Sequence, residues 1–460
     1  MKNVLKALNG FFFAPIDARW FGLMRVTWAF CALLWMGMQW VDVAEFYSNA
    51  GVIPQAMEPM MLRADYRFTL LTWVTTPDAV FALYLLMLFC FLCMMIGVLP
   101  RLFTIASMVL LFSFHERNPL PYGGGDTVLR VLGMLLIIAP CIDAFSVERL
   151  RRQWKQWQTS GTLLAPPTMA IWPYRLLLWQ FVVLYGTSLW FKLMGTMWRN
   201  GTAVASALHH PVFTRFPKTL MDVLTPFMPL VDFATLAWQG TWLLLLIPKP
   251  LTDAVLPRGM LKRLIIVGGV LFHGSILILM DAGSFSIAIF SGYCGLLLTE
   301  DFDAMRAWVN GRWQRTKSAA STTNYQSSPR LRPAGKLQTT NSITVLFDGR
   351  CVFCRKSIFV LQILDHLRRL SFVNFYDAAK RKQIAPEIPL ENLQKAMHVM
   401  VPPTTYKLQP TNYQGFDAFR VLCWHLPALW PLAPLLYLPG VPWIGRATYG
   451  IIARRRHTLA

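Results

Sequence analysis

The chain has 460 residues, of which 55% are hydrophobic and only 15% are charged, and its mean hydropathy is +0.42. These values exclude an ordinary soluble enzyme, because soluble domains carry about 25% charged residues. The formal net charge of +21 is compatible with a nucleic-acid partner. However, the basic residues fall mainly in short connections between apolar segments and in the C-terminal third, as in cytoplasmic loops beside anionic lipid. We therefore predict an integral membrane protein that contacts membrane lipid and no nucleic acid.

Eight apolar segments come near the length of a membrane-spanning helix, which is roughly 17 to 25 residues. The N-terminus is basic, but no small-residue cleavage site follows the phenylalanines at 11–13, so we expect the first span to be retained. The predicted fold class of this part is a polytopic α-helical bundle of about eight spans. They are expected at residues 20–40, 79–98, 102–114, 127–145, 174–193, 230–247, 264–280 and 285–298.

Lysine and arginine collect on alternate connections between these segments. If the N-terminus is cytoplasmic, the inside connections hold Arg101 and the basic groups at 149–155, 249–263 and 306–317. The outside loops are longer but hold fewer basic residues. Because positive residues mark the cytoplasmic side, both termini are predicted to be cytoplasmic in a bacterial-type inner membrane.

The composition changes after residue 312. Residues 313–341 are rich in serine, threonine, asparagine, glutamine and proline, and they offer almost no large apolar side chain to bury. Such a composition is typical of a flexible linker. We therefore expect a membrane domain at 1–312 and a second domain at 342–460.

The second domain begins with the pattern of an α/β unit. Strands are predicted at 344–347, 370–375 and 398–401, and helical stretches at 355–369 and 390–396. This β-α-β beginning indicates a thioredoxin-like order. The apolar tail at 426–445 contains five prolines and is expected to pack on this domain or to lie against the membrane surface.

Two cysteines, Cys351 and Cys354, lie between the first strand and the first helix of this domain. The first would occupy the helix N-terminus, where free N–H groups and the helix dipole favour a thiolate. The second would lie one turn on, within reach to close a disulfide. The pattern predicts a catalytic dithiol in which Cys351 attacks a target disulfide and Cys354 resolves the mixed disulfide. In a reducing cytosol the pair would act as a reductant.

A structural pair or half of a zinc site is the alternative for these cysteines. Zinc would need two more ligands, and the domain offers only Cys423 and four histidines, none in a second paired motif. We therefore predict no metal. Cys90 and Cys93 repeat the same spacing inside an apolar segment, where cysteine is a good small filler and a thiolate is disfavoured. Packing is the expected role there, and an electron relay across the membrane is the alternative.

Lys192 and His273 are the candidate catalytic residues of the membrane domain. Burying an ion at mid-bilayer costs at least about 2.5 kcal/mol, so ionisable groups in spans often mark function. Lys192 lies near a span end, where a lysine can also reach the interface harmlessly. The alternative is a shared polar site of Lys192 and His273 with either residues 115–117 or the groups at 126–130. A desolvated lysine in such a site could act as a base.

Residues 341–460 resemble the DCC family of thiol-disulfide oxidoreductases, also known as DUF393. The resemblance implies a thioredoxin-like redox domain with Cys351 and Cys354 as its active cysteines. The matching motifs are Phe-Asp-Gly-Arg-Cys-Val-Phe-Cys at 347–354, Met-His-Val-Met at 397–400, Gly-Phe-Asp-Ala-Phe at 415–419 and Tyr-Gly-Ile-Ile-Ala-Arg-Arg-Arg at 449–456.

The membrane part resembles an HTTM domain, the bacterial relative of the membrane region of the vitamin K-dependent γ-carboxylase. The resemblance places Lys192 in the segment that carries the carboxylase's base lysine. The carboxylase's lumenal domain, which handles its protein substrate, has no counterpart, so carboxylation of glutamate is not implied. The matching segments are 21–25, 94–101, 185–193, 272–273 and 283–287.

Together these features predict an enzyme, a membrane-anchored thiol-disulfide oxidoreductase. Its partner would be an unidentified disulfide-bearing protein or small molecule. One alternative is a membrane-embedded enzyme that acts on a quinone or lipid and draws electrons from the dithiol. Another is a transporter or maturation scaffold without redox chemistry. No cofactor is firmly implied, and a quinone belongs to the first alternative only.

Overall fold

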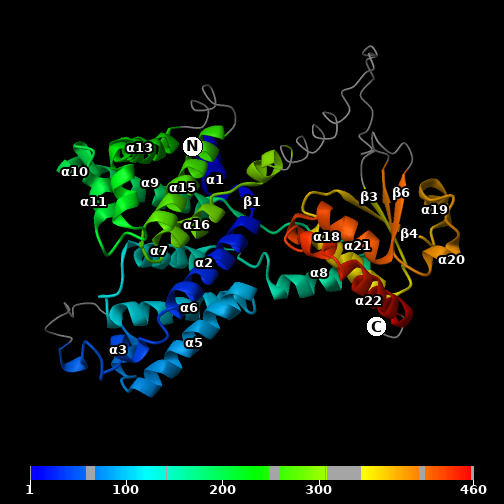
Figure 1. The fold of residues 1–460 in the computed structure, drawn as a ribbon, viewed down its shortest axis with the longest axis horizontal. Coiled ribbons are helices and arrows are strands. Elements are labelled where there is room, and N and C mark those ends of the chain that lie inside the picture. Colours follow the sequence, from blue (N-terminus) through cyan, green and yellow to red (C-terminus); the bar gives the residue numbers. More distant parts are fainter. Residues whose placement is uncertain are drawn as a thin grey trace, which may run out of the picture. The chain divides into compact units, whose positions relative to one another are not determined.

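The computed structural model describes residues 2–57, 68–140, 142–247, 259–305, 307, 343–402 and 410–456. The chain divides into two compact units, Met1–Phe302 and Asp303–Ala460 (Figure 1). Each is described by itself. The predicted linker at 313–341 lies outside the described residues.

The described part of the first unit is helical apart from one short strand pair, in which β1 (Pro15–Asp17) runs antiparallel to β2 (Thr168–Ala170). Short 3-10 turns are η1 (Gln55–Met57), η2 (Leu70–Thr72), η3 (Thr225–Phe227) and η4 (Trp242–Leu246). The α-helices are α1 (Lys2–Phe13), α2 (Arg19–Gly37), α3 (Val43–Tyr47), α5 (Pro77–Ile96), α6 (Pro100–Arg117), α7 (Gly124–Ile138), α8 (Val147–Ser160), α9 (Trp172–Met194), α10 (Thr196–Arg199), α11 (Ala203–His209), α12 (Lys218–Leu224), α13 (Met228–Thr241), α15 (Met260–Leu279) and α16 (Phe285–Gly295).

Helix α5 shows how local sequence sets the ends of an apolar helix. Pro77 fits the first position, because no N–H is needed there, and Asp78 complements the positive end of the helix dipole. The helix stops at Gly97, whose φ of 74° lies in the left-handed region. A Cβ at Gly97 would lie 2.3 Å from the Cβ of Ser146 and 2.6 Å from Nη1 of Arg25. Gly97 is therefore required by space as well as by conformation.

Arg25 of α2 is fully buried beside this helix end. Its guanidinium donates hydrogen bonds to the carbonyl of Met94 in the last turn of α5 and, at 3.0 Å each, to the carbonyls of Ala144 and Phe145. The last carbonyls of a helix have no partner within the helix and carry the negative end of its dipole. Arg25 thus ties α2 to the end of α5 and to the loop before α8.

Trp28 continues the packing one turn along α2. Its buried ring packs edge-on against Phe91 of α5, with 6.0 Å between the ring centroids, and its Nε1 donates to the carbonyl of Leu129 of α7 at 2.8 Å. Helix α2 also packs against α16. The core of the unit is therefore built around α2.

Five helices in the described part are long and apolar enough to cross a membrane, and the number rises to six if one bent pair is a single span. This supports the predicted membrane protein, but it does not confirm eight spans. The five are Arg19–Gly37, Pro77–Ile96, Trp172–Met194, Lys218–Leu246 and Met260–Leu279, and the bent pair is Phe285–Gly295 with Thr299–Met305, at 98°.

The three other predicted spans are not long, apolar single helices of this kind, for different reasons. Helix α6 has 18 residues but carries Arg101, Glu116 and Arg117 near its ends. Helix α7 has 15 residues, or about 22 Å at 1.5 Å per residue, against a hydrocarbon core of about 30 Å. Helix α16 has 11 residues before the chain bends. Apolar composition predicted these segments but not where each helix ends.

The second unit contains a four-stranded sheet. The strand order is β4-β3-β5-β6, with β3 parallel to β4 and antiparallel to β5, and β5 antiparallel to β6. The predicted β-α-β beginning is present. The elements are β3 (Ile343–Phe347), α18 (Val352–Leu364), β4 (Leu370–Asn374), α19 (Ala378–Ile384), α20 (Leu390–Leu393), β5 (His398–Val401), β6 (Thr411–Gln414), α21 (Gly415–His425), η5 (Pro427–Leu429), η6 (Pro434–Tyr437) and α22 (Val441–Arg455).

The helices of this unit lie in two groups. In Figure 1, α18, α21 and α22 lie together on one side of the strands, and α19 and α20 lie on the other. The proline-rich tail forms η5 and η6, which pack against α21 and α22 respectively. The tail therefore packs on the small domain, which is one of the two arrangements predicted for it.

Replacing Arg25 by methionine should destabilise the first unit. The substitution keeps an apolar stem but leaves three carbonyls, two of them in buried hydrogen bonds, without their donor, which should cost at least about 2 kcal/mol of unfolding free energy. Thermal unfolding of the full chain in detergent micelles, followed by tryptophan fluorescence, would measure the loss. Arg151→Met, at an exposed position of α8, is the matched control. Equal melting of both variants would show that these hydrogen bonds do not stabilise the fold.

Candidate functional site

The two predicted cysteines lie at the junction of β3 and α18. Cys351 is the residue immediately before the helix, and its Sγ accepts a hydrogen bond from the main-chain N–H of Cys354 at 3.3 Å. The first N–H groups of a helix have no partner within the helix, so this sulfur satisfies one of them. The same contact and the helix dipole stabilise negative charge on the sulfur.

Asp348 holds the turn that leads into the helix. Its buried carboxylate accepts hydrogen bonds from the N–H groups of Arg350 at 2.9 Å and Cys351 at 3.2 Å. The next residue, Gly349, donates its N–H to the side chain of Asn374, and a Cβ there would lie 2.3 Å from that amide. The motif Asp-Gly-Arg-Cys is thus explained by the turn that it forms.

The end of α22 covers the first cysteine. Cys351 is only 1% exposed, and its Sγ lies 3.7 Å from the main-chain oxygen of Arg456. The guanidinium of Arg456 donates to the carbonyl of Gln394 and lies 3.9 Å from the carboxylate of Asp348. Arg456 therefore holds the chain end against the turn that carries the dithiol.

The two thiols differ in their chemistry. Burial, followed by the hydrogen bond and charge of Cys351, raises the pKa of Cys354 to about 12. At pH 7 such a group is a thiolate in roughly one molecule in 100,000. Cys354 therefore remains protonated at pH 7.

A cavity of about 770 Å³ lies beside Cys354. Its walls come from α18, α21, the tail and α22, and most of the lining side chains are apolar. Cys354 lines this cavity, whereas Cys351 does not. The sulfur best suited to carry charge is therefore not the one that faces the open space.

The zinc alternative finds no support in the described part of the chain. No group of three or more His, Cys, Asp or Glu residues there is arranged to hold a metal ion. His398 of β5 is hydrogen bonded to Asn412 and to the carbonyl of Asn392, and Cys423 is buried in α21. His457 lies outside the described residues.

Comparison with known proteins supports the predicted chemistry of this unit. Residues 345–460 match the family described as DCC1-like thiol-disulfide oxidoreductase. The second unit thus carries a DCC1-like domain. The match confirms the family resemblance predicted for it and indicates an oxidoreductase. The HTTM resemblance of the membrane part stays a prediction.

One curated relative extends the comparison. Sporulation-delaying protein SdpB of Bacillus subtilis is 22% identical over 188 residues, which is 41% of this chain and 55% of SdpB. The chain thus spans about half the length of this relative. No solved structure matches.

In the membrane unit, His273 lies in a buried hydrogen-bonded group. Its Nε2 and the hydroxyl of Tyr185 are 2.7 Å apart, and that hydroxyl is 2.6 Å from the hydroxyl of Tyr293. The three residues come from α15, α9 and α16. Both tyrosines were missed by the sequence reasoning, because a tyrosine in an apolar segment gives no signal that it pairs with a distant histidine.

Lys192 belongs to a neighbouring group. Its Nζ donates to Oγ of Ser188 at 2.6 Å and lies 5.0 Å from the ring centroid of Trp198. Oγ of Ser188 also accepts a hydrogen bond from Gln239. Lys192 is near enough to His273 to act on it electrostatically. Chemistry by either residue stays a prediction.

The other groups suggested for a shared site have partners of their own. Arg130 pairs with Glu116 at 2.5 Å. Asp126 accepts hydrogen bonds from Trp35 and Ser284. The described hydrogen bonds thus place these groups in networks apart from Lys192 and His273.

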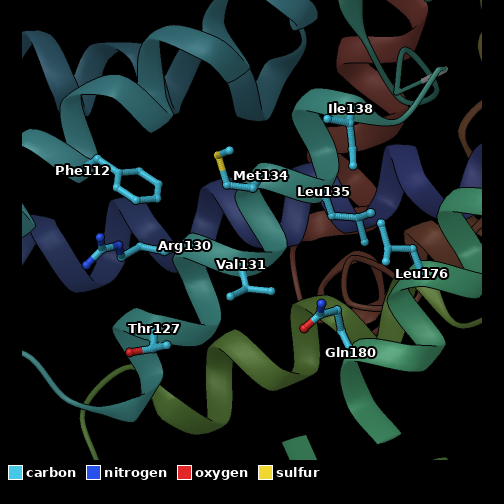
Figure 2. Close-up of a pocket in the computed structure, with 9 residues that line it drawn as sticks. All are labelled: Phe112, Thr127, Arg130, Val131, Met134, Leu135, Ile138, Leu176 and Gln180. Atoms are coloured by element: carbon cyan, nitrogen blue, oxygen red, sulfur yellow. The ribbon is translucent and has the colours of Figure 1, made fainter. Parts of the chain in front are cut away.

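A groove of about 480 Å³ lies between α7 and α9, with Phe112 of α6 at one side (Figure 2). Arg130 and Gln180 are the larger polar side chains at its wall, and the guanidinium of Arg130 lies 4.3 Å from the ring centroid of Phe112. Because Arg130 is already paired and the remaining wall is mostly apolar, we assign no chemistry to this groove.

Cys90 and Cys93 are both buried in α5, 4% and 6% exposed. Cys90 belongs to the hydrophobic core of the first unit. Their environment agrees with the predicted packing role.

The raised pKa of Cys354 predicts a pH dependence that can be measured in the Cys351→Ser variant. Removing Cys351 removes its contributions to the raised pKa of Cys354, but burial, the largest single cause, remains. Alkylation of Cys354 by iodoacetamide should therefore be at least about tenfold slower at pH 7 than in the urea-unfolded chain, and it should rise about tenfold per pH unit from 7 to 9. Mass spectrometry of the cysteine peptide gives the rate. A rate that levels off below pH 8 would show that the folded chain does not raise this pKa.

Proposed function

We propose that the protein is a membrane-anchored thiol-disulfide oxidoreductase that works through Cys351 and Cys354. The observation that most supports this is the position of Cys351 directly before α18, with its sulfur accepting the N–H of Cys354. This geometry lies within the region that matches the DCC1-like family.

The reaction proceeds in two exchanges. The thiolate of Cys351 attacks one sulfur of the target disulfide, the target S–S bond breaks, and one target thiolate leaves. Cys354 then attacks the sulfur of Cys351, the mixed disulfide breaks, and the second target thiolate leaves. The target gains two electrons and two protons, and the protein is left with a Cys351–Cys354 disulfide.

The second exchange requires Cys354 to lose its proton. Because its pKa is raised to about 12, a nearby proton acceptor would accelerate this step. Asp348 is buried next to the pair, and its charge contributes to the raised pKa of Cys354. Asp348 is thus the proposed acceptor, in addition to its role in the turn.

Charge and access favour different cysteines as the attacking group. Cys354 faces the cavity, but its thiolate fraction at pH 7 is roughly 10⁻⁵. Cys351 is 1% exposed, and its Sγ lies 3.7 Å from the main-chain oxygen of Arg456. Attack by Cys351 requires Arg456 to move aside, but the helix N-terminus favours a thiolate on Cys351. Cys351 is therefore the proposed nucleophile.

The apolar helices of the first unit would anchor this domain in a bacterial-type inner membrane. The distribution of basic residues supports cytoplasmic N- and C-termini. In that compartment the dithiol would rest reduced and act as a reductant. The target is a disulfide carried by a protein or a small molecule.

Trapping experiments would identify the attacking cysteine. Cys354→Ser should accumulate mixed disulfides through Cys351, because the resolving thiol is missing, and Cys351→Ser should accumulate few. Non-reducing electrophoresis and mass spectrometry of the full chain would detect the adducts. Accumulation in Cys351→Ser instead would reverse the order of attack. Absence of adducts in both, with stoichiometric zinc in the purified protein, would contradict the redox function.

The proposed orientation can be tested at Trp443, which is 77% exposed on α22. A Trp443→Cys substitution, made with Cys351 and Cys354 changed to serine, places an accessible thiol on the small domain. A membrane-impermeant maleimide should label this variant only after the cells are opened. The double-serine parent is the control. Labelling in intact spheroplasts would place the domain outside the cytoplasm and favour an oxidising role.

A further inference from the structure

We propose that the cavity beside Cys354 binds the apolar body of a small-molecule disulfide, which is the substrate class of the dithiol. The inference rests on the proposed function. A cavity of about 770 Å³ falls within the range of roughly 300 to 1,000 Å³ that is typical of small-molecule sites. It is formed within the second unit alone, mainly between α18, α21 and α22.

Polar groups gather at the dithiol end of this cavity. Arg456 and Asp348 lie 3.9 Å apart, and both act electrostatically on Cys354. Tyr449 also lines the cavity, and its hydroxyl accepts the N–H of Met397 at 3.0 Å. The reacting disulfide of a bound ligand would lie at this end, beside Cys354.

The rest of the wall suits a hydrocarbon body. Phe416 and Phe419 of α21, Leu361 of α18 and Ile452 of α22 line it. Removing each methylene from water into such surroundings contributes a factor of about four in binding. A substrate whose disulfide lies at the thiol end and whose body is hydrocarbon is thus complementary to the cavity.

The outer surface of the same segment is also apolar. Trp443 is 77% exposed, Ile451 is 51% exposed and Leu435 is 53% exposed. Ile451 and Ile452 are neighbours on α22, but only Ile452 lines the cavity. An apolar substrate partitions into lipid, so an anchored domain with an apolar rim is suited to receive it.

The reaction balances without a further reagent. The two thiols of Cys351 and Cys354 give two electrons and two protons to the substrate R–S–S–R, which leaves as two R–SH molecules, and the protein gains one disulfide. The first exchange forms a bond between Cys351 and one substrate sulfur. The second sulfur leaves with its alkyl group.

The test uses the reduced full chain in lipid nanodiscs and two probes, dihexyl disulfide and bis(2-hydroxyethyl) disulfide. Formation of the Cys351–Cys354 disulfide is followed by mass spectrometry of the cysteine peptide. The wild type and Ile451→Asp should react at least about tenfold faster with the dihexyl probe. Ile452→Asp should lose this preference and react with both probes at similar rates. Ile451→Asp controls for partition of the probe into lipid, because it changes the same residue type one position away.

A second variant guards against misfolding of Ile452→Asp. Ala453→Phe fills the cavity without adding charge, and it should also remove the preference for the dihexyl probe. The cavity assignment would be overturned if both cavity variants kept the preference for the dihexyl probe, or if Ile451→Asp lost it equally. Equal rates with the two probes in the wild type would also overturn it. Failure of the wild-type pair to react with either probe would contradict the proposed function itself.

Discussion

Main-chain groups at buried helix ends need partners, and this constraint organises both units. The carbonyl of Met94, in the last turn of α5, would lose its donor if Arg25 were absent. The first N–H groups of α18 need acceptors in the same way, and there the sulfur of Cys351 accepts the N–H of Cys354. One unit solves the problem with a buried cation that holds helices together. The other solves it with a thiol that can react.

The hydrogen bond that starts α18 therefore has two consequences. It stabilises the helix, and it distinguishes two cysteines that are only one turn apart. The sulfur of Cys351 accepts the N–H of Cys354, whereas burial and the neighbouring Cys351 raise the pKa of the Cys354 thiol. The apolar cavity lies on the side of Cys354. The two sulfurs thus differ in their surroundings because of their places at the start of one helix.

The dithiol could be predicted from the sequence because its geometry is local: a strand, a glycine turn and a helix start follow one another within a few residues. The lengths of the apolar helices could be predicted only in part. Composition placed α7 and α16 correctly but could not show that each ends before it reaches spanning length. The partners of His273 were beyond prediction, since Tyr185 lies 88 residues away in sequence. The cavity could not be predicted from the sequence either, because its walls come from three separate helices and the tail.

The contact between Cys351 and Arg456 carries a mechanical consequence. An adduct on the sulfur of Cys351 and the main-chain oxygen of Arg456, now 3.7 Å away, would compete for the same space. In the proposed exchange, the end of α22 would therefore have to move away from Cys351 and return afterwards. In that exchange the main chain at Arg456 would act as a cover on the thiol, and its position would report whether Cys351 carries an adduct.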